Sequence, residues 1–326
     1  MWGTQLKHVV VTEELHPAGR ALLDDRADIV TTYLQGSHDK LPAALAEAQA
    51  ILVRTMELTA SDLRAASRLE IVSRHGVGCD NIDVQHLSSR GIPMAIAVNS
   101  NTTSVVEHVL MMMLALNKRA FQYDQFTRHG KFDQRSRHHT SELYGKHVLI
   151  VGFGRIGKRV APVCKALGMR VTVADIALDH AHAAEIGVET VSDFKTRLDK
   201  SDYVTVHVPL DESTHHLISQ AEIEAMPAHA ILINCARGGI IDEHAVAEAL
   251  ETGALAAFGC DVFSQEPPPA DHPLFTVPNT LLTPHNAAGT AESLQRMATY
   301  ASQNILDHFD GRLAVDSIFN ANALSR

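Results

Sequence analysis

Short apolar runs alternate with longer amphipathic stretches over the first hundred residues of the chain. The runs are rich in β-branched residues and lie at residues 8–12, 28–34, 50–56 and 69–76. Patterns typical of helices separate them, at residues 16–25, 41–49 and 60–67. Strands and helices in alternation predict a parallel sheet whose faces are covered by helices.

The alternation stops at residues 101–130. There the stretch SVVEHVLMMMLALNKRAFQYDQF predicts one long helix between two α/β units. Its methionines, at residues 111–113, are typical of a core or a subunit interface, because the flexible thioether side chain fills irregular apolar surfaces.

A second alternation follows, with six strand candidates at residues 146–152, 170–175, 203–209, 230–236, 257–263 and 280–285. Six such strands predict a dinucleotide-binding sheet. The amphipathic stretch at residues 292–309 should return to the first unit, because the chain ends soon afterwards. We therefore expect two doubly wound parallel-sheet α/β domains. A Rossmann domain (residues 101–290) would be inserted into a discontinuous, flavodoxin-like substrate domain (residues 1–100 and 291–326).

The composition narrows the functional classes. The 326 residues are too many for one comfortable core. The formal charge of −10 comes without any block of lysine or arginine, which argues against a nucleic acid or a membrane surface as partner. No apolar run is long enough to span a membrane and no signal pattern opens the chain, so we expect a cytoplasmic protein. The 20 histidines and four cysteines show no metal-ligand spacing, so no metal site is predicted.

A glycine motif directly follows the first strand candidate of the second half. Gly152, Gly154 and Gly157 form Gly-x-Gly-x-x-Gly, and a helical pattern continues after the third glycine. This context predicts a tight turn, a close approach of the backbone to a pyrophosphate and close packing of helix on strand. The pyrophosphate would bind free amides at the helix N-terminus, around Arg155 and Ile156, and the Arg155 side chain would add a positive charge.

The next strand candidate ends in Asp175, which lies 18 residues after Gly157. A carboxylate in this place accepts hydrogen bonds from the ribose hydroxyls and repels a 2′-phosphate. Residues 176–178 supply no compensating cation, so the sequence predicts NAD rather than NADP. The alternative is that Asp175 only caps the turn that follows its strand.

A second glycine turn, RHGVGCDNID, also follows a strand, but Asn81 occupies the place of the third glycine. It therefore does not predict a second nucleotide site. The consecutive amides of Val77 and Gly78 could form a small nest that binds a carboxylate. Alternatively, the glycines only turn the chain into a helix.

Three polar residues follow strand candidates in the second half of the chain. Arg237 stands in INCARGG, Glu266 in DVFSQEPP and His285 in LLTPHNAAG. Because open α/β sheets bind ligands at the carboxyl ends of their strands, we expect the three to meet there. An arginine released from a buried strand needs a partner, which a substrate carboxylate would provide. Taken singly, each residue also has a plain structural explanation.

These motifs, in this order, resemble the D-2-hydroxyacid dehydrogenases, and within them the phosphoglycerate-dehydrogenase-like branch. The resemblance extends over nearly the whole chain and rests on RHGVGCDNID, NTTSVVEHVL, ELYGKHVLIVGFGRIGKRVA, INCARGGIIDEHA, GCDVFSQEPP and TPHNAAG. It implies an NAD-dependent oxidoreductase, active as a homodimer, that interconverts a 2-oxo acid and a D-2-hydroxy acid.

The resemblance also implies roles for single residues. His285 would deliver a proton to the keto oxygen, Glu266 would favour and orient the imidazolium, and Arg237 would bind the substrate carboxylate. Gly238 and Gly239 would leave room for substrate and cofactor. The matching substrate contacts are Arg54, Val77 and Gly78. The residues expected to border the cofactor are Val208, Pro209, Thr214, Cys235, Ala236 and Asp261.

Three features depart from the pattern of the branch. His75 stands where a small residue is common, so we expect a substrate pocket of altered shape or charge. Asn286 and Ala287 replace the more usual apolar residue and glycine after His285. The chain ends near residue 326, so a regulatory C-terminal domain is not expected.

Two alternatives stay open. An NAD-sensing regulator that keeps this fold would act through protein partners, although the three catalytic candidates are intact and no charged tail is present. A formate dehydrogenase would be expected to carry glutamine in place of Glu266. Among dehydrogenase substrates, 3-phosphohydroxypyruvate, hydroxypyruvate, glyoxylate and a sulfonated 2-oxo acid all suit the same arginine and nest. A second anion on the substrate could meet Arg54, Arg74 or Arg137.

Overall fold

The computed structural model describes residues 6–136 and 140–324, so that Arg137 and the pair His138-His139 lie outside the described residues. The chain forms two compact units. The first consists of Met1–Asn101 and Gly289–Arg326, and the second of Thr102–Ala288. The junctions expected from the sequence lie after residues 100 and 290.

The first unit contains a five-stranded parallel sheet, ordered β2-β1-β3-β4-β5. Its strands are β1 (Lys7–Val11), β2 (Ile29–Tyr33), β3 (Ala50–Val53), β4 (Ile71–Arg74) and β5 (Met94–Ile96). This is the flavodoxin-like order, so the predicted fold class is confirmed. The apolar pattern of the sequence does not reveal β5, because this strand has only three residues.

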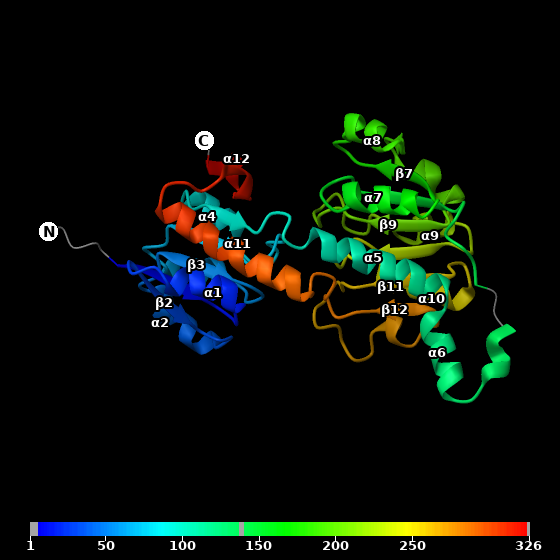
Figure 1. Ribbon diagram of the computed structural model, residues 1–326, viewed down its shortest axis with the longest axis horizontal. Coiled ribbons are helices and arrows are strands. Elements are labelled where there is room, and N and C mark those ends of the chain that lie inside the picture. Colours follow the sequence, from blue (N-terminus) through cyan, green and yellow to red (C-terminus); the bar gives the residue numbers. More distant parts are fainter. Residues whose placement is uncertain (1–5, 137–139, 325–326) are drawn as a thin grey trace. The chain divides into compact units, whose positions relative to one another are not determined.

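Helices cover both faces of this sheet. Figure 1 shows α1 (Pro17–Asp24) beside α11 (Ala291–Phe309), and the two are in contact. They enclose an apolar core with the sheet that includes Val9, Leu52 and Ala298. The second core of the unit lies under α2 (Leu41–Leu45), α3 (Ala60–Ala65) and α4 (Val84–Ser89). The short helix α12 (Ala321–Leu324) follows α11.

The second unit contains a seven-stranded parallel sheet, ordered β12-β11-β10-β9-β6-β7-β8. Its strands are β6 (His147–Val151), β7 (Arg170–Ala174), β8 (Glu189–Val191), β9 (Tyr203–Val206), β10 (Ile231–Asn234), β11 (Ala257–Cys260) and β12 (Thr280–Leu282). This is the Rossmann order, extended by one strand. The expected number of six strands is wrong because β8 is a partly exposed edge strand of three residues, without an apolar run.

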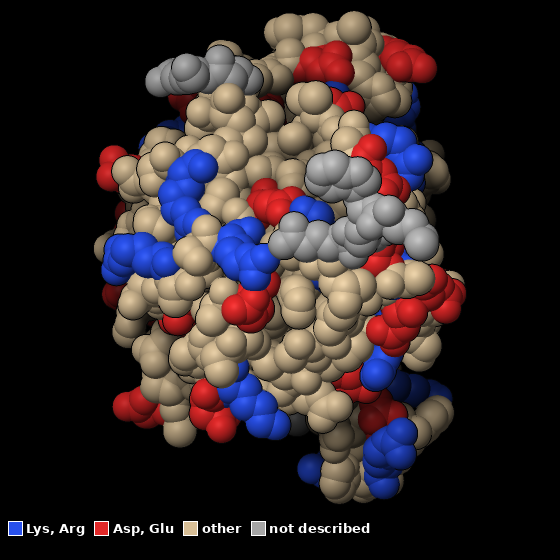
Figure 2. Space-filling view, turned by 90° about the vertical axis from the view of Figure 1, so that its left-hand side faces the viewer, with Lys and Arg blue, Asp and Glu red and all other residues tan. Residues whose placement is uncertain are grey.

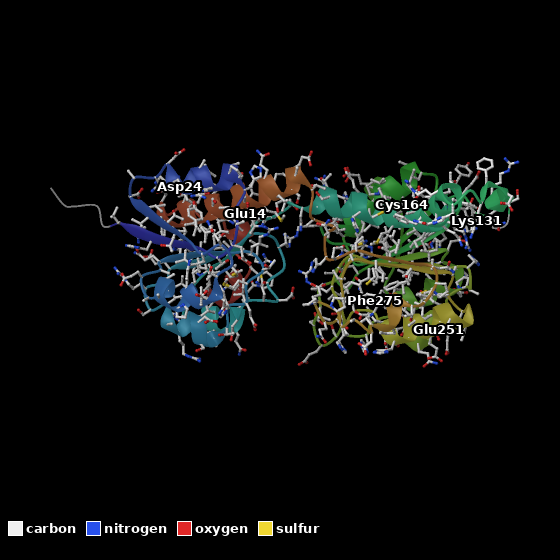
Figure 3. All side chains as sticks on the ribbon, turned by 90° about the horizontal axis from the view of Figure 1, so that it is seen from below. Glu14, Asp24, Lys131, Cys164, Glu251 and Phe275 are labelled. Atoms are coloured by element: carbon white, nitrogen blue, oxygen red, sulfur yellow. The ribbon has the colours of Figure 1, made fainter. Side chains whose placement is uncertain are left out.

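The two faces of this sheet have separate cores. One core includes side chains of α5 (Thr102–Asn117), α7 (Gly157–Ala166) and α8 (His180–Ile186). The other lies against α9 (Gln220–Glu224) and α10 (Glu243–Thr252). Figure 3 shows Cys164 of α7 and Phe275 on opposite faces of the sheet. A doubly wound sheet therefore presents its strand ends, rather than a face, to ligands.

The predicted single helix through residues 104–126 is wrong. The structure has two helices there, α5 and α6 (Ala120–Arg128). They are separated at Arg119, whose φ of 49° lies in the left-handed region. The Asn117 side chain at the end of α5 donates a hydrogen bond to the Ser141 carbonyl (2.9 Å). The apolar pattern continues across the break, so periodicity alone does not reveal it.

All four cysteines, Cys79, Cys164, Cys235 and Cys260, are free and buried, as expected of small core residues. Among the described residues, no helix has the length and apolar character needed to cross a membrane.

Candidate functional site

The glycine turn between β6 and α7 leaves no room for side chains at two of its three glycines. A Cβ at Gly152 would lie 2.6 Å from the His207 carbonyl group, and one at Gly157 would lie 2.0 Å from the Gly152 oxygen. A Cβ at Gly154 would meet nothing within 4 Å. The first and third glycines thus serve the packing of the protein itself, and the second leaves its side open to a ligand.

The turn also presents amides to that open side. Within the described part of the chain, the amides of Arg155 and Ile156 donate no hydrogen bond. They stand at the N-terminus of α7, a helix of ten residues, where the helix dipole favours an anion. The Arg155 side chain is exposed. These residues fit the pyrophosphate of a dinucleotide.

Asp175 follows β7 and holds the glycine turn. Its carboxylate accepts hydrogen bonds from the Phe153 amide (2.6 Å) and from the Ala177 amide (2.8 Å). Each carboxylate oxygen keeps a lone pair for a further donor, such as a ribose hydroxyl. The capping role and the cofactor role of Asp175 are therefore compatible. The neighbouring Ile176 is fully exposed and offers an apolar surface beside this carboxylate, which the sequence analysis does not anticipate.

The loop after β9 carries Val208, Pro209 and Thr214. The Thr214 hydroxyl donates to the Pro209 carbonyl (2.7 Å) and accepts from the Asp211 amide (2.8 Å), so it closes the loop. At the end of β10, Cys235 and Ala236 are buried. All five residues lie at carboxyl ends of strands, on the edge of the sheet that carries the glycine turn.

The structure brings two of the three catalytic candidates into contact. Glu266 and His285 follow the neighbouring strands β11 and β12, and the His285 Nδ1 atom lies 2.7 Å from the Glu266 Oε2 atom. The Phe263 amide donates to the other oxygen of Glu266 (3.0 Å). His285 has a φ of 51°, which is rare for this residue type and is held by a hydrogen bond from its amide to the Asp261 carbonyl (2.7 Å). Backbone strain of this kind is frequent at functional sites.

The third candidate, Arg237, acts on this pair through its charge. Burial raises the pKa of Glu266, but hydrogen bonds from His285 and the Phe263 amide and the charges of His285 and Arg237 outweigh burial and hold the pKa below its usual value. Glu266 is therefore a carboxylate at neutral pH. The Arg237 side chain is half-buried and donates a hydrogen bond to the Ala236 carbonyl (2.6 Å).

The structure gives a different reason for the glycine at position 238 from the one expected from the sequence. A Cβ there would lie 1.9 Å from the Phe263 carbonyl oxygen. The protein's own backbone, rather than a ligand, excludes a side chain at this position. Gly239 has a φ of 76°, so it provides the left-handed turn after Arg237.

Asp261 braces the loop that carries His285. Its buried carboxylate accepts hydrogen bonds from the Thr283 hydroxyl (2.5 Å) and from the amides of Asn286 (2.8 Å) and Ala287 (2.9 Å). His108 of α5 joins this group, with its Nε2 atom 3.0 Å from the Thr283 hydroxyl. Sequence reasoning misses His108, although it stands inside the quoted motif NTTSVVEHVL.

An apolar hollow adjoins the imidazole and carboxylate. It has a volume of about 350 Å³ and lies between the loops that follow β11 and β12. Besides Glu266 and His285, the main lining residues are Phe263, Pro267, Phe275 and Leu282. The His285 and Glu266 side chains themselves are 48% and 37% exposed, so solvent still screens their interaction.

In the first unit, the turn after β4 leaves the predicted amides available. Among the described residues, the Val77 and Gly78 amides find no hydrogen-bond acceptor. Arg74 braces the turn by donating to the carbonyls of Gly78 (2.8 Å) and His75 (3.0 Å). The geometry suits a nest for a carboxylate.

Arg54 stands on the loop after β3, and Glu13 holds that loop through the main chain. The Glu13 carboxylate accepts hydrogen bonds from the amides of Arg54 (3.0 Å) and Met56 (2.6 Å), and it also bonds Thr55. The shape of this loop therefore does not depend on the Arg54 side chain, and a substitution of Arg54 should leave the loop in place.

His75 changes the shape of this region rather than its charge. The residue is only 5% exposed. Burial, together with the charges of Arg54 and Arg74, lowers the pKa of His75 to about 4. The imidazole is therefore neutral at neutral pH, and the cations of the region are the two arginines.

Figure 2 shows acidic and basic side chains scattered over one side of the molecule, with larger uncharged areas between them.

Comparison with known proteins identifies the family. Residues 110–287 match the family model described as D-isomer specific 2-hydroxyacid dehydrogenase, NAD binding domain. The D-3-phosphoglycerate dehydrogenase of Methanocaldococcus jannaschii is 36% identical over 94% of this chain, and that of Archaeoglobus fulgidus is 39% identical over 84%. These matches cover 58% and 52% of the relatives, so the chain spans little more than half of their length.

A solved structure extends the likeness over nearly the whole chain. The D-lactate dehydrogenase of Aquifex aeolicus, crystallised with NAD and lactic acid, is 28% identical, with a TM-score of 0.84. The match covers 94% of this chain and 96% of that one. The chain therefore belongs to the D-isomer specific 2-hydroxyacid dehydrogenases, and its second unit is their NAD-binding domain.

Proposed function

We propose that this protein is an NAD-dependent dehydrogenase that interconverts a 2-oxo acid and the corresponding D-2-hydroxy acid. The observation that carries the proposal is the contact of 2.7 Å between His285 and Glu266, with the charge of Arg237 acting on the same carboxylate. These groups stand at strand ends of an NAD-binding domain, where ligands of such sheets bind.

The acid–base step follows from the geometry of the pair. Because Nδ1 of His285 is bonded to Glu266, Nε2 is the ring nitrogen that holds the proton for the keto oxygen. The Glu266 carboxylate stabilises the positive imidazolium and fixes its orientation. When bound, NADH supplies the hydride to the keto carbon. In the reverse direction, His285 takes the proton of the hydroxyl group.

Arg237 would bind the substrate carboxylate and polarise the keto oxygen. A guanidinium offers paired donors that match the two carboxylate oxygens. In the first unit, the amides of Val77 and Gly78 and the guanidinium of Arg54 would contact the substrate. Asp175 would bind the ribose, and the expected cofactor contacts are Gly152, Gly154, Gly157, Val208, Pro209, Thr214, Cys235, Ala236 and Asp261.

Among substrates, we favour 3-phosphohydroxypyruvate, with hydroxypyruvate, glyoxylate and a sulfonated 2-oxo acid as further candidates. The relatives named D-3-phosphoglycerate dehydrogenase support this order. Two guanidinium groups near the Val77–Gly78 turn, those of Arg54 and Arg74, are suited to a substrate with a second anion.

We also propose a homodimer. Exposed apolar side chains on α5, on α6 and shortly after α6 support it, since such surfaces mark protein contacts. They are Met111, Leu114, Phe121 and Phe132. Light scattering tests this proposal, and a monomer at micromolar concentration would contradict it.

The decisive experiment measures NADH oxidation with a panel of 2-oxo acids, each compared with its phosphorylated or sulfonated relative, and NAD reduction with formate. We expect turnover with at least one 2-oxo acid. His285→Ala should lower turnover by roughly two to four orders of magnitude while NADH still binds. NADH binding without turnover on any substrate would favour a regulator, and near-normal turnover of His285→Ala would remove His285 from the mechanism.

Arg237→Lys tests the carboxylate contact. The substitution keeps the charge but loses the planar fork, so the KM for the 2-oxo acid should rise sharply. Kinetics equal to those of the wild type would show that Arg237 does not bind the substrate.

A further inference from the structure

Two buried ionisable side chains outside the catalytic candidates meet behind the loop that carries Glu266. Glu243 is the first residue of α10, and His272 immediately precedes the short helix at Pro273–Phe275. They are only 6% and 7% exposed. The His272 Nε2 atom lies 2.8 Å from the Glu243 Oε2 atom. A buried carboxylate is costly unless it is well bonded, so its partners show what it holds.

Hydrogen bonds determine which nitrogen of His272 carries the proton. The Leu274 amide donates to Nδ1 (3.3 Å), so Nδ1 is the acceptor and Nε2 donates to Glu243. The ring packs edge-on against Phe263, with centroids 5.4 Å apart and an interplanar angle of 84°. His272 is therefore held on both edges and cannot turn without losing two hydrogen bonds.

The Glu243 carboxylate also accepts hydrogen bonds from Ser264. Its Oε1 atom accepts from the Ser264 amide (2.7 Å), and its Oε2 atom accepts from the Ser264 hydroxyl (2.9 Å). Ser264 directly follows Phe263, whose amide donates to Glu266 (3.0 Å). The buried pair thus holds the backbone segment that orients the Glu266 carboxylate.

The same segment limits the turn after Arg237. Because the Phe263 carbonyl occupies the space where Gly238 would carry a side chain, the two loops are in close backbone contact. The backbone at Gly238 therefore packs directly against Phe263 and limits how far this segment can move.

We propose that Glu243 and His272 are positioning residues for the dehydrogenase reaction: they hold Ser264 and, through the Phe263 amide, set the orientation of Glu266 toward His285. This inference rests on the proposed function, since it concerns the step in which Glu266 and His285 act together. Both residues are buried behind the loop, so we expect their effect in the chemical step rather than in substrate binding.

His272→Phe is the principal test, because it keeps the aromatic packing against Phe263 and removes the donor to Glu243. We expect kcat to fall by about 10- to 100-fold, as is typical of a small misplacement of a reacting group. The dissociation constant of NADH should not change. The KM for the 2-oxo acid should change by less than about threefold, because ground-state binding is kept.

The pH profile gives a second readout that simple destabilisation would not move. The charged groups facing Glu266 are His285, on the loop after β12, and Arg237, on the loop after β10. A weakened bond from the Phe263 amide raises the pKa of Glu266 toward its usual value. The acid limb of kcat for reduction should therefore move to higher pH in His272→Phe.

Two milder variants should give smaller losses of kcat than His272→Phe. His272→Gln places an amide donor near Glu243 and should recover most of the kcat lost in His272→Phe. Ser264→Ala removes one hydroxyl hydrogen bond from an exposed residue, and we expect kcat to fall about three- to tenfold, in keeping with the loss of a single hydrogen bond.

His147→Phe is the matched control. His147 is 5% exposed and its ring is bonded to the Lys200 carbonyl (3.0 Å) and the Thr172 hydroxyl (2.8 Å). It stands at the amino end of β6, the opposite edge of the sheet from the strand ends that carry Glu266 and His285. We expect its kcat and pH profile to match those of the wild type, even where Tm falls.

The outcomes separate this inference from the proposed function. A wild-type kcat and pH profile in His272→Phe, or an equal loss of kcat in His147→Phe, would overturn the positioning role. If His272→Phe does not fold, Ser264→Ala decides by the same two readouts. A wild-type chain that turns over no 2-oxo acid would instead overturn the proposed function, and the inference with it.

Discussion

The two glycine turns of this protein begin alike and end differently. Both follow a parallel strand, β6 in the second unit and β4 in the first. In the second unit the third glycine, Gly157, is also the first residue of α7. In the first unit Asn81 takes that place, donates a side-chain hydrogen bond to the Met56 carbonyl (2.7 Å), and α4 starts only at Val84.

The source of positive potential differs accordingly. At the turn after β6, the N-terminus of the helix follows directly, and the helix dipole favours an anion at the free amides. At the turn after β4, the guanidinium groups of Arg54 and Arg74 act on His75, which stands within the turn. The turn after β6 suits a pyrophosphate, and the turn after β4 suits a small anion. A glycine pair alone therefore does not specify the ligand; the residue at the third position and the surrounding charges do.

The largest effect is expected at Gly157. A Cβ there would lie 2.0 Å from the Gly152 oxygen, so Gly157→Ala should separate helix from strand. We expect Tm to fall, because overpacking costs about 1–3 kcal/mol of stability. NADH should bind about 100-fold more weakly, because the displaced helix moves the amides that would hold the pyrophosphate. Fluorescence titration of NADH and thermal unfolding measure both.

Two companion variants sharpen this test. Gly154→Ala should weaken NADH binding with little change in Tm, because a Cβ there meets no protein atom within 4 Å. Asn81→Gly should leave NADH binding unchanged. Equal NADH affinity in Gly157→Ala and the wild type would contradict the role assigned to the turn after β6.

The next effect concerns the pH dependence of the free energy of unfolding, and it is expected at the turn after β4. Since the pKa of His75 falls from 6.5 to about 4 on folding, the unfolded chain takes up a proton below pH 6.5 that the folded chain takes up only near pH 4. The contribution of the neutral His75 to the free energy of unfolding is therefore fully present above pH 6.5 and is lost as the pH falls toward 4. The loss due to His75 should amount to about 3 kcal/mol.

His75→Gln should remove this part of the pH dependence. The measurement is the difference in the free energy of unfolding of the full chain between pH 7 and pH 4.5, by urea denaturation. His38→Gln, at an exposed histidine of the same unit, serves as the control and should keep the wild-type slope. An unchanged slope in His75→Gln would show that the imidazole is not held neutral.

A smaller effect is expected at Arg54. Arg54→Gln should raise the KM for the 2-oxo acid about 10- to 100-fold, because a hydrogen bond to a charged group contributes about 1.5–3 kcal/mol. The loop should keep its shape, since Glu13 binds its amides rather than the guanidinium. Steady-state kinetics are compared with Arg64→Gln, an exposed arginine of α3. If both variants keep the wild-type KM, Arg54 does not contact the substrate.

The smallest effect is expected at Asp175. Asp175→Ala should lower the preference for NAD over NADP about tenfold, because the carboxylate that repels a 2′-phosphate is lost. Catalytic efficiencies with NADH and NADPH measure the preference. A wild-type protein that prefers NADPH would overturn the cofactor assignment of this turn.

Local patterns in the sequence predicted the parts that depend on neighbouring residues. The β-branched runs and the Gly-x-Gly-x-x-Gly motif predicted the doubly wound sheets and the dinucleotide turn. The positions of Arg237, Glu266 and His285 after consecutive strands predicted that they share one edge of the sheet. Strand-end geometry follows from chain order, because successive strands of a parallel sheet point the same way.

Other features depend on contacts between distant residues, and the pattern could not reveal them. The break at Arg119 and the edge strand β8 have no signature in the spacing of apolar residues. Gly238 is explained by a backbone 25 residues away, at Phe263.

The sequence by itself determined the layer architecture, the dinucleotide turn and the three residues offered for chemistry. Only the tertiary structure decided that His75 is buried and neutral and that Glu243 and His272 stand behind Glu266. The physical reason is that periodicity and turn residues act over a few positions of the chain. Burial and hydrogen-bond partners, in contrast, arise only when segments far apart in sequence pack together.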